Sequence, residues 1–235
     1  DSLALHIFKP RNMQAGEKRP AIVYFFGGGW KLGTPLQFYR ECAYYASKGM
    51  VAVSVDYRIE YLHHSTPFDS FEDAKDAICW LRSHASDYQL DPDKIAVAGG
   101  SAGGHLAAAL GTIGSDEAVN YRPNLSVLYY PVVDMVSRGY GFPEIKRDFE
   151  KISPIHHVSE ATPSTLILLG TKDPIVSVET IRSYQDKLLQ KGVDCELHLF
   201  EGAGHPIFLY RKPLTEDYYK VRKLTDDFLK REGFL

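Results

Sequence analysis

One serine in the sequence lies in a context that suits nucleophilic chemistry. Ser101 belongs to the segment GGSAG, between the apolar run KIAVA and the helix-forming run HLAAAL. Small residues two positions before and after it, Gly99 and Gly103, allow a strand and a helix to approach closely at a sharp turn that exposes the hydroxyl. The turn also places the amide of Ala102 at a helix N-terminus, where it faces developing negative charge. The alternative is a glycine-rich turn with an incidental serine, whereas the phosphate-binding glycine patterns GxGxxG and GxxxxGK[S/T] do not occur in the sequence.

A serine hydroxyl needs a general base, and the base needs an acid that orients it. His205 differs from the other histidines because it lies in a small-residue loop, EGAGHPIF, directly after the last apolar run. Asp173, in GTKDPIV, follows the preceding apolar run in the same way. Because the carboxyl ends of parallel strands lie together, we predict that both side chains meet Ser101. Asp134, after YYPVV, is the rival acid, and Asp56 fits a structural role better.

A run of glycines offers hydrogen-bond donors to the same site. Gly27, Gly28 and Gly29 directly follow the apolar run AIVYFF, and Trp30 comes next. Consecutive glycines let backbone N–H groups point into a site without obstructing side chains. Together with the Ala102 amide they would stabilise an oxyanion, each donor being worth roughly 3 to 4 kcal/mol of barrier; a flexible loop is the alternative. Trp30 is a candidate for stacking on a sugar or aromatic ring of the substrate, although a core position is more common for such a side chain.

These residues need a scaffold of strands that alternate with helices, and the rest of the sequence has that pattern. Apolar runs rich in β-branched and aromatic residues predict strands at 3–8, 21–26, 50–57, 94–100, 126–133, 164–170 and 195–200. Helical periodicity lies between and after these runs, over 36–49, from residue 70 onward, after residue 101, and from near residues 178 and 215. Continuously apolar strands that alternate with helices predict an α/β fold, a mostly parallel sheet covered by helices on both faces.

Two local features complete this expectation. Ser70 and Asp73 have the spacing of a capping box, which predicts the start of the long helix at Ser70. Residues 134–162 are the least regular part of the chain, and we expect them to form an excursion over the active site.

Length and composition restrict the class of protein. The 235 residues suit one domain, 1–235, with a large core. The formal charge is −3, and the sequence has neither a basic stripe nor an apolar run long enough to span a membrane. We therefore expect that the partners include neither nucleic acid nor membrane. Cys42, Cys79 and Cys195 fit neither a disulfide framework nor zinc-ligand spacing, and we expect no metal and no cofactor. The oligomeric state is open, and so is the compartment: a processed chain would be secreted or periplasmic, and otherwise the chain would be cytoplasmic.

Six motifs resemble, in order and over nearly the whole chain, those of the esterase branch of the α/β-hydrolases: FFGGGW, VDYR, DPDKIAVAGGSAGGHLAA, YYPVVD, GTKDPIV and GAGH. The resemblance is closest to small bacterial acetyl xylan and feruloyl esterases, and looser to the hormone-sensitive-lipase group. It implies the α/β-hydrolase fold, in which nucleophile, acid and base follow one another along the chain.

Carried over residue by residue, the resemblance implies Ser101 as nucleophile, His205 as base and Asp173 as acid. It also implies an oxyanion hole formed by the amides of Gly28, Gly29 and Ala102. The family usually has a histidine before the glycine run, where this chain has Phe26, so packing would have to hold the loop here. Lipase-like relatives carry an N-terminal cap of helices for which this sequence has no room, and we expect an open site.

The resemblance implies a serine carboxylesterase that acts through an acyl-enzyme on short acyl esters, acetyl or feruloyl, of small molecules or xylan-type polysaccharides. An arylformamidase and a small peptidase are alternatives within the fold, because amides use the same machinery. Outside the enzymes, the alternative is a catalytically silent binding module. Such modules typically lose the nucleophile or the base, and this chain keeps Ser101 and His205.

Overall fold

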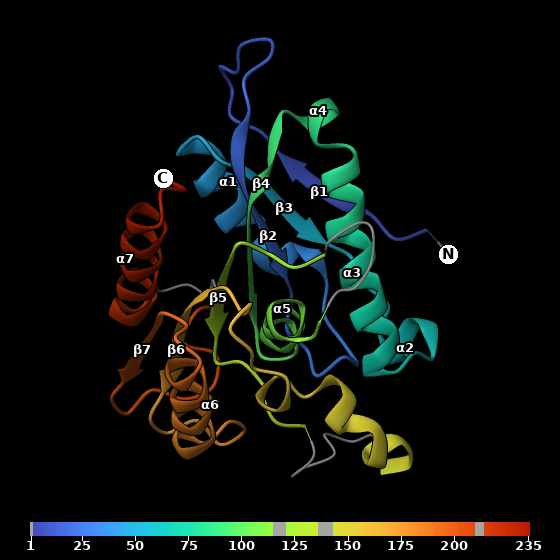
Figure 1. Ribbon diagram of the computed structural model, residues 1–235, viewed down its shortest axis with the longest axis vertical. Helices are drawn as coiled ribbons and strands as arrows, with labels where there is room; N and C mark the ends of the chain where they lie inside the picture. The colour runs from blue at the N-terminus through green and yellow to red at the C-terminus, as the bar shows by residue number, and fades with distance from the viewer. Residues whose placement is uncertain (1, 115–120, 136–142, 210–213) are drawn as a thin grey trace.

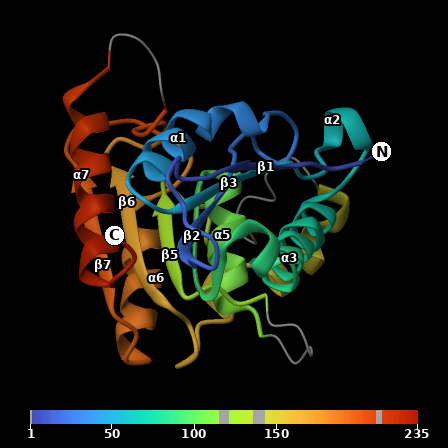
Figure 2. The same cartoon turned by 90° about the horizontal axis from the view of Figure 1, so that it is seen from above.

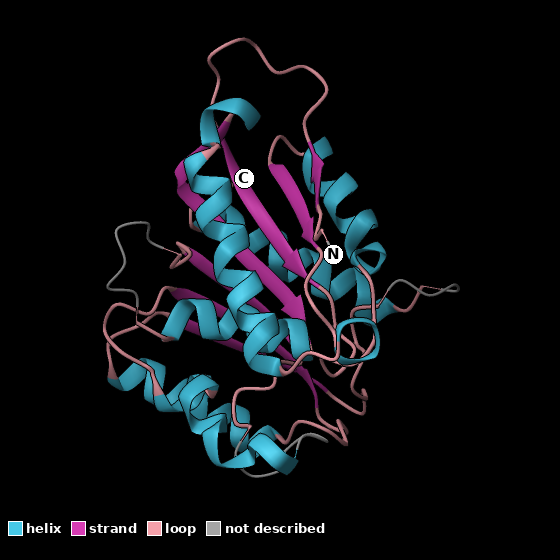
Figure 3. Cartoon of the chain, turned by 90° about the vertical axis from the view of Figure 1, so that its right-hand side faces the viewer, coloured by secondary structure: helices cyan, strands magenta, loops and turns pink. Residues whose placement is uncertain are grey.

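A seven-stranded sheet runs through the centre of the molecule (Figure 1). The computed structural model describes residues 2–114, 121–135, 143–209 and 214–235. The strands are β1 (Leu5–Phe8), β2 (Arg19–Phe25), β3 (Val51–Val55), β4 (Leu90–Gly100), β5 (Leu125–Tyr129), β6 (Ser164–Gly170) and β7 (Cys195–Phe200). Their order across the sheet is β1-β3-β2-β4-β5-β6-β7, and only β1 is antiparallel to its neighbour. The arrowheads of the parallel strands point towards one edge of the sheet (Figure 3), which therefore collects the loops that follow them.

Helices cover both faces of the sheet. They are α1 (Tyr39–Ser47), α2 (Glu60–His63), α3 (Pro67–Ser83), α4 (Ala85–Tyr88), α5 (Ala102–Thr112), α6 (Val178–Gln190) and α7 (Glu216–Arg231), with 3₁₀ helices η1 (Pro35–Phe38), η3 (Pro143–Ile152) and η4 (Pro154–His156). Helices α1 and α7 lie on one face, joined by a hydrogen bond that Tyr218 donates to Glu41, and α3, α5 and α6 lie on the other (Figure 2). Within the described ranges, no helix has the length and apolar character that a membrane crossing needs.

The predicted α/β architecture is confirmed, and its apolar strands form the core. Residues 21–25 of β2 are fully buried, as expected for a strand that has neighbours on both sides and helices on both faces. Strand β5 is shorter than the predicted 126–133 and ends at Tyr129. Tyr130 then adopts a positive φ of 39°, and Pro131, which cannot donate a ladder hydrogen bond, follows it.

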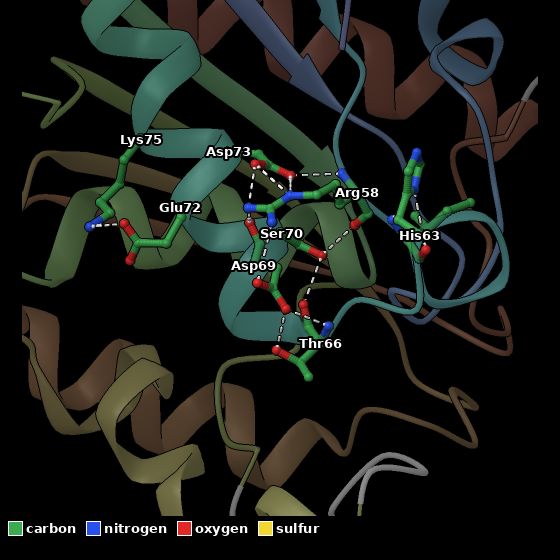
Figure 4. Close-up of polar contacts among 9 residues, drawn as sticks. Arg58, His63, Thr66, Asp69, Ser70, Glu72, Asp73 and Lys75 are labelled. Carbon is green, nitrogen blue, oxygen red and sulfur yellow. Dashed lines mark hydrogen bonds and ion pairs between the residues drawn. The ribbon is translucent and has the colours of Figure 1, made fainter. Parts of the chain in front are cut away.

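The predicted start of the long helix at Ser70 is wrong. Helix α3 begins at Pro67, and its capping box is formed by Thr66 and Asp69: the Asp69 carboxylate accepts hydrogen bonds from the Thr66 amide and hydroxyl, both at 2.8 Å (Figure 4). Asp73 instead accepts hydrogen bonds from the guanidinium of Arg58, at 2.8 Å for Nη2. Ser70 donates to the carbonyl of Arg58 at 2.7 Å. The two residues with capping-box spacing thus anchor α3 to the segment after β3.

His105, in the first turns of α5, is a fully buried histidine outside the predicted site. Its Nε2 lies 2.7 Å from the carbonyl oxygen of Ile152, and because a carbonyl can only accept, Nε2 carries the proton. Burial lowers the pKa of His105 to about 4, because the charged imidazolium would lose its hydration.

We expect acid to destabilise the protein through His105. Between an unfolded-state pKa of about 6.5 and the folded-state pKa of about 4, the unfolded chain binds the extra proton, so stability falls as the pH falls through this window. From pH 7 to pH 5, the free energy of unfolding should drop by about 2 kcal/mol more in the wild type than in His105→Gln. Urea denaturation at both pH values measures this difference. The exposed His156→Gln should follow the wild type, and an equal drop in His105→Gln would contradict the prediction.

Candidate active site

Ser101 lies at a strained turn between β4 and α5. Its backbone angles are φ 56° and ψ −118°, outside the regions that a serine normally adopts. The amide of Ser101 donates to the carbonyl of Tyr129 at 3.1 Å, which fixes the turn against β5. A Cβ added to Gly103 would lie 2.0 Å from the carbonyl oxygen of Phe25, and one added to Gly99 would lie 2.3 Å from the carbonyl oxygen of Gly103. The small residues that flank the serine are therefore required by the close approach of β2, β4 and α5.

The loops after β6 and β7 bring an acid and a base to this serine. Nε2 of His205 lies 2.8 Å from Oγ of Ser101, and Nδ1 of His205 lies 2.7 Å from Oδ2 of Asp173. Because a carboxylate accepts, Nδ1 carries the proton of the neutral imidazole, and Nε2 accepts from the serine hydroxyl. The three residues that the sequence places after separate strands thus form a continuous hydrogen-bonded chain.

Asp173 is held as a carboxylate by its surroundings. Its side chain is 0% exposed, and burial by itself would raise its pKa. The hydrogen bond from His205 and those from the amides of Val176 and Ile175, at 2.9 and 2.8 Å, outweigh this effect, so the pKa of Asp173 lies below its ordinary value. Nδ1 of His205 is therefore engaged by Asp173 and not by the rival acid Asp134.

The glycine run after β2 lies in the wall of the same cavity. Gly28 and Gly29 have φ values of 151° and 64°, which favour glycine, and both residues line the cavity beside Ser101. A Cβ on Gly28 would lie 1.9 Å from the carbonyl oxygen of Leu32, so no larger residue fits this turn. The third predicted donor, Ala102, is the first residue of α5 and is buried directly after Ser101.

Packing holds the start of this loop, as the presence of Phe26 led us to expect. The Phe26 ring stacks on Tyr57, with ring centroids 4.0 Å apart and planes 14° apart. The Tyr57 hydroxyl donates to the carbonyl of Phe26 at 2.6 Å. Gln37, which no sequence pattern singled out, adds hydrogen bonds to the backbone of Gly27.

Trp30 is buried, which favours the alternative of a core position over that of a stacking surface. Although it borders the cavity, it is only 1% exposed. Its ring packs edge-on against His105, with centroids 5.1 Å apart. Tyr130, which sequence reasoning missed, contacts the site instead: its ring centroid lies 4.8 Å from that of His205, and it lines the cavity. The only sequence signal for Tyr130 was its place before Pro131 at the end of a strand.

The cavity beside Ser101 has a volume of about 380 Å³, and its lining includes four apolar side chains, those of Val132, Ile175, Pro206 and Leu209. We expected residues 134–162 to cover the active site, but those of them that the structure describes do not do so. Residues 136–142 lie outside the described residues, and η4 packs beside α5 and α6, where Lys187 donates to the carbonyl of Ile155. Among the residues whose side chains the structure describes, none of those that line the cavity comes from η3 or η4.

The ionisable groups of the site are arranged for proton transfer. Both ring nitrogens of His205 are engaged, one by Ser101 and one by Asp173. Across the described ranges, no group of three or more His, Cys, Asp or Glu side chains has an arrangement that could hold a metal ion. The chemistry that this arrangement itself supports is attack by a serine oxygen that loses its proton to an imidazole.

A mostly parallel sheet with a serine at a strand-to-helix turn, an acid after β6 and a histidine after β7 defines the α/β-hydrolase class. The chain also matches the model of the family described as BD-FAE over residues 5–142, and it belongs to this family. The resemblance to α/β-hydrolase esterases is thereby confirmed.

Several of the curated relatives and solved structures to which the chain is similar are esterases. Esterase LipC of Mycobacterium tuberculosis is 30% identical over 86% of this chain, and the acetylxylan esterase of Xylanibacter ruminicola is 26% identical over 84%. The chain spans about half the length of these relatives, 56% and 44% respectively.

The structure of a Thermogutta terrifontis esterase, Est2, with propionate bound is similar with a TM-score of 0.93 and 38% identity, covering 100% of this chain and 91% of that one. Further structures of the same esterase carry butyrate or are phosphorylated by paraoxon.

Proposed function

We propose that this domain is a serine carboxylesterase in which Ser101, His205 and Asp173 form the catalytic triad. The observation that supports this most directly is the unbroken hydrogen-bonded chain from Oγ of Ser101 through both nitrogens of His205 to the buried carboxylate of Asp173. The membership of the BD-FAE family and the esterase relatives support the same reaction class.

The geometry suits acyl transfer in two steps. Ser101 attacks the ester carbonyl while Nε2 of His205 takes its proton, and Asp173 stabilises the imidazolium that forms. The amides of Gly28, Gly29 and Ala102 are the proposed donors to the oxyanion of the tetrahedral intermediate. His205 then gives its proton to the departing alcohol, and water hydrolyses the acyl-enzyme by the same route.

We further propose that the acyl group is short. The cavity that Ser101 lines has a volume of only about 380 Å³, and Est2, which shares the fold throughout this chain, has been solved with propionate and with butyrate. Acetyl or feruloyl esters of xylan-type sugars are the proposed natural substrates, supported by the BD-FAE match and the acetylxylan esterase among the relatives. Arylformamidase and peptidase activities would use the same triad, so the esterase relatives, and not the site geometry, favour ester hydrolysis. The unbroken hydrogen-bonded chain argues against a silent binding module.

Ser101→Ala tests the nucleophile. Because the substitution removes one oxygen that lies at a cavity wall, we expect the fold to persist and hydrolysis of p-nitrophenyl acetate to fall by about 10⁴-fold or more. Steady-state kinetics measures the loss, and circular dichroism checks the fold. A fluorophosphonate probe should label the wild type and not the variant. Substantial turnover by a folded Ser101→Ala would refute the assignment, and an unlabelled, inactive wild type would favour the binding module.

The identity of the acid can be tested with a matched pair of variants. Asp173→Asn removes the charge that holds Nδ1 protonated, and we expect kcat to fall by about 10³- to 10⁴-fold. Asp134→Asn makes the same chemical change at the rival position and should keep kcat within about threefold of the wild type. The reverse ranking of the two variants would move the catalytic acid to Asp134.

A substrate series tests the acyl group and the sugar. Among p-nitrophenyl esters of straight-chain acids, we expect kcat/KM to be highest between acetate and butyrate. It should drop by about tenfold or more at octanoate, because the few apolar side chains of the cavity offer a long flexible chain little surface to pack against. Acetate release from acetylated xylan and hydrolysis of methyl ferulate test the proposed natural substrates. A preference for octanoate would contradict the short acyl group. If the enzyme hydrolyses p-nitrophenyl esters but neither acetylated xylan nor methyl ferulate, only the proposed natural substrates are contradicted.

A further inference from the structure

The peptide that carries the proposed Gly28 donor is held by a side chain to which the mechanism assigns no role. Gln37, in η1, faces the backbone of Gly27 with its carboxamide: Oε1 accepts from the Gly27 amide at 3.0 Å, and Nε2 donates to the Gly27 carbonyl at 2.7 Å. Both ends of the carboxamide are engaged, so its orientation is fixed by the contacts. If the carboxamide were flipped, its nitrogen would face the Gly27 amide nitrogen and its oxygen would face the Gly27 carbonyl oxygen, and both hydrogen bonds would be lost.

These contacts determine the direction of the next amide. The carbonyl of Gly27 and the N–H of Gly28 belong to one planar, trans peptide unit and point in opposite directions. When Gln37 holds the carbonyl towards itself, the Gly28 N–H is directed to the other side. A peptide between two glycines has no Cβ to restrain it, so an outside partner has to set its plane.

The neighbouring peptide units have partners of their own. The carbonyl of Phe26 accepts from the Tyr57 hydroxyl, and the carbonyl of Gly28 accepts from the amides of Leu32 and Lys31. The loop is also pressed against the serine turn, because a Cβ on Gly27 would lie 2.7 Å from the carbonyl oxygen of Gly100. Gln37 therefore sets the plane of the one peptide that connects these two fixed ends.

We propose that Gln37 is a positioning residue, which holds the Gly27–Gly28 peptide in the orientation that presents the Gly28 amide to the oxyanion. This proposal rests on the proposed esterase function. Gln37 acts on the transition state through the backbone, although its side chain also borders the cavity. The test must therefore separate a positioning role from direct contact with the substrate.

Gln37→Met keeps a side chain of similar length and removes both hydrogen bonds. The matched control is Gln185→Met, because Gln185 also donates to a backbone carbonyl, that of Cys195, and is not among the residues that line the cavity. With p-nitrophenyl acetate, we expect kcat of Gln37→Met to fall by about 10- to 100-fold with KM within about threefold. The affinity for a trifluoromethyl ketone, whose serine adduct carries an oxyanion, should fall by a similar factor, and inhibition by butyrate should not change.

Kinetics can overturn the proposal in two ways. A raised KM with unchanged kcat would make Gln37 a substrate contact, and unchanged values of both would leave it without a role in catalysis. If Gln37→Met does not fold, Gln37→Glu serves instead: it fills the same space, still accepts from the Gly27 amide and sets an anionic oxygen against the Gly27 carbonyl. The same loss of kcat is expected from it.

Hydrogen exchange of the Gly27 amide measures how firmly Gln37 fixes this backbone, independently of activity. The Gly27 amide should exchange about tenfold faster or more in Gln37→Met than in the wild type or Gln185→Met, because its acceptor is gone. Equal exchange rates would overturn the proposal even in an active enzyme. If the wild type hydrolyses no ester, but the Gly27 amide still exchanges faster in Gln37→Met, the proposed function is overturned. The conclusion that Gln37 fixes the Gly27–Gly28 peptide then still stands.

Discussion

The site depends on one constraint, the close approach of β2, β4 and α5 around Ser101. The positive φ of Ser101 is unfavourable by about 1 to 3 kcal/mol and persists only because the surrounding structure fixes it. The Ser101 amide is bound to β5, and Gly103 lies directly against the backbone of Phe25, so the turn cannot relax without separating buried elements. The strained turn thereby sets the hydroxyl of Ser101 at the end of β4, directly before the first residue of α5.

The other parts of the site are positioned relative to that turn by hydrogen bonds to the Asp173 carboxylate and by ring packing. The two backbone amides that bind Oδ1 of Asp173 leave Oδ2 for His205, and the ring of Tyr130 packs against the imidazole. Each of these supports comes from the residues just after a strand of the same sheet. The geometry of the hydrogen-bonded chain therefore follows from the register of β4, β5, β6 and β7, which one continuous core holds together.

The sequence predicted the parts of the structure that depend on chain order, and missed those that depend on how side chains meet. Ser101, Asp173 and His205 could be found because each follows an apolar strand, and parallel strands bring such positions to one edge. The burial of Trp30, the contact of Tyr130 with His205 and the true start of α3 could not be found in this way. Each is decided by a tertiary partner, such as the Arg58 side chain that takes Asp73 away from a capping role.

Phe26 illustrates the same limit, and it bears on how the site responds to pH. A histidine at this position would support the glycine loop with a group that titrates near neutrality. Here the support comes from stacking on Tyr57, from the Tyr57 hydroxyl, whose pKa burial raises, and from the Gln37 carboxamide, which does not titrate. The glycine loop is thus held by groups that stay neutral near neutral pH. Protonation changes in the neutral range therefore leave this support of the glycine loop unchanged.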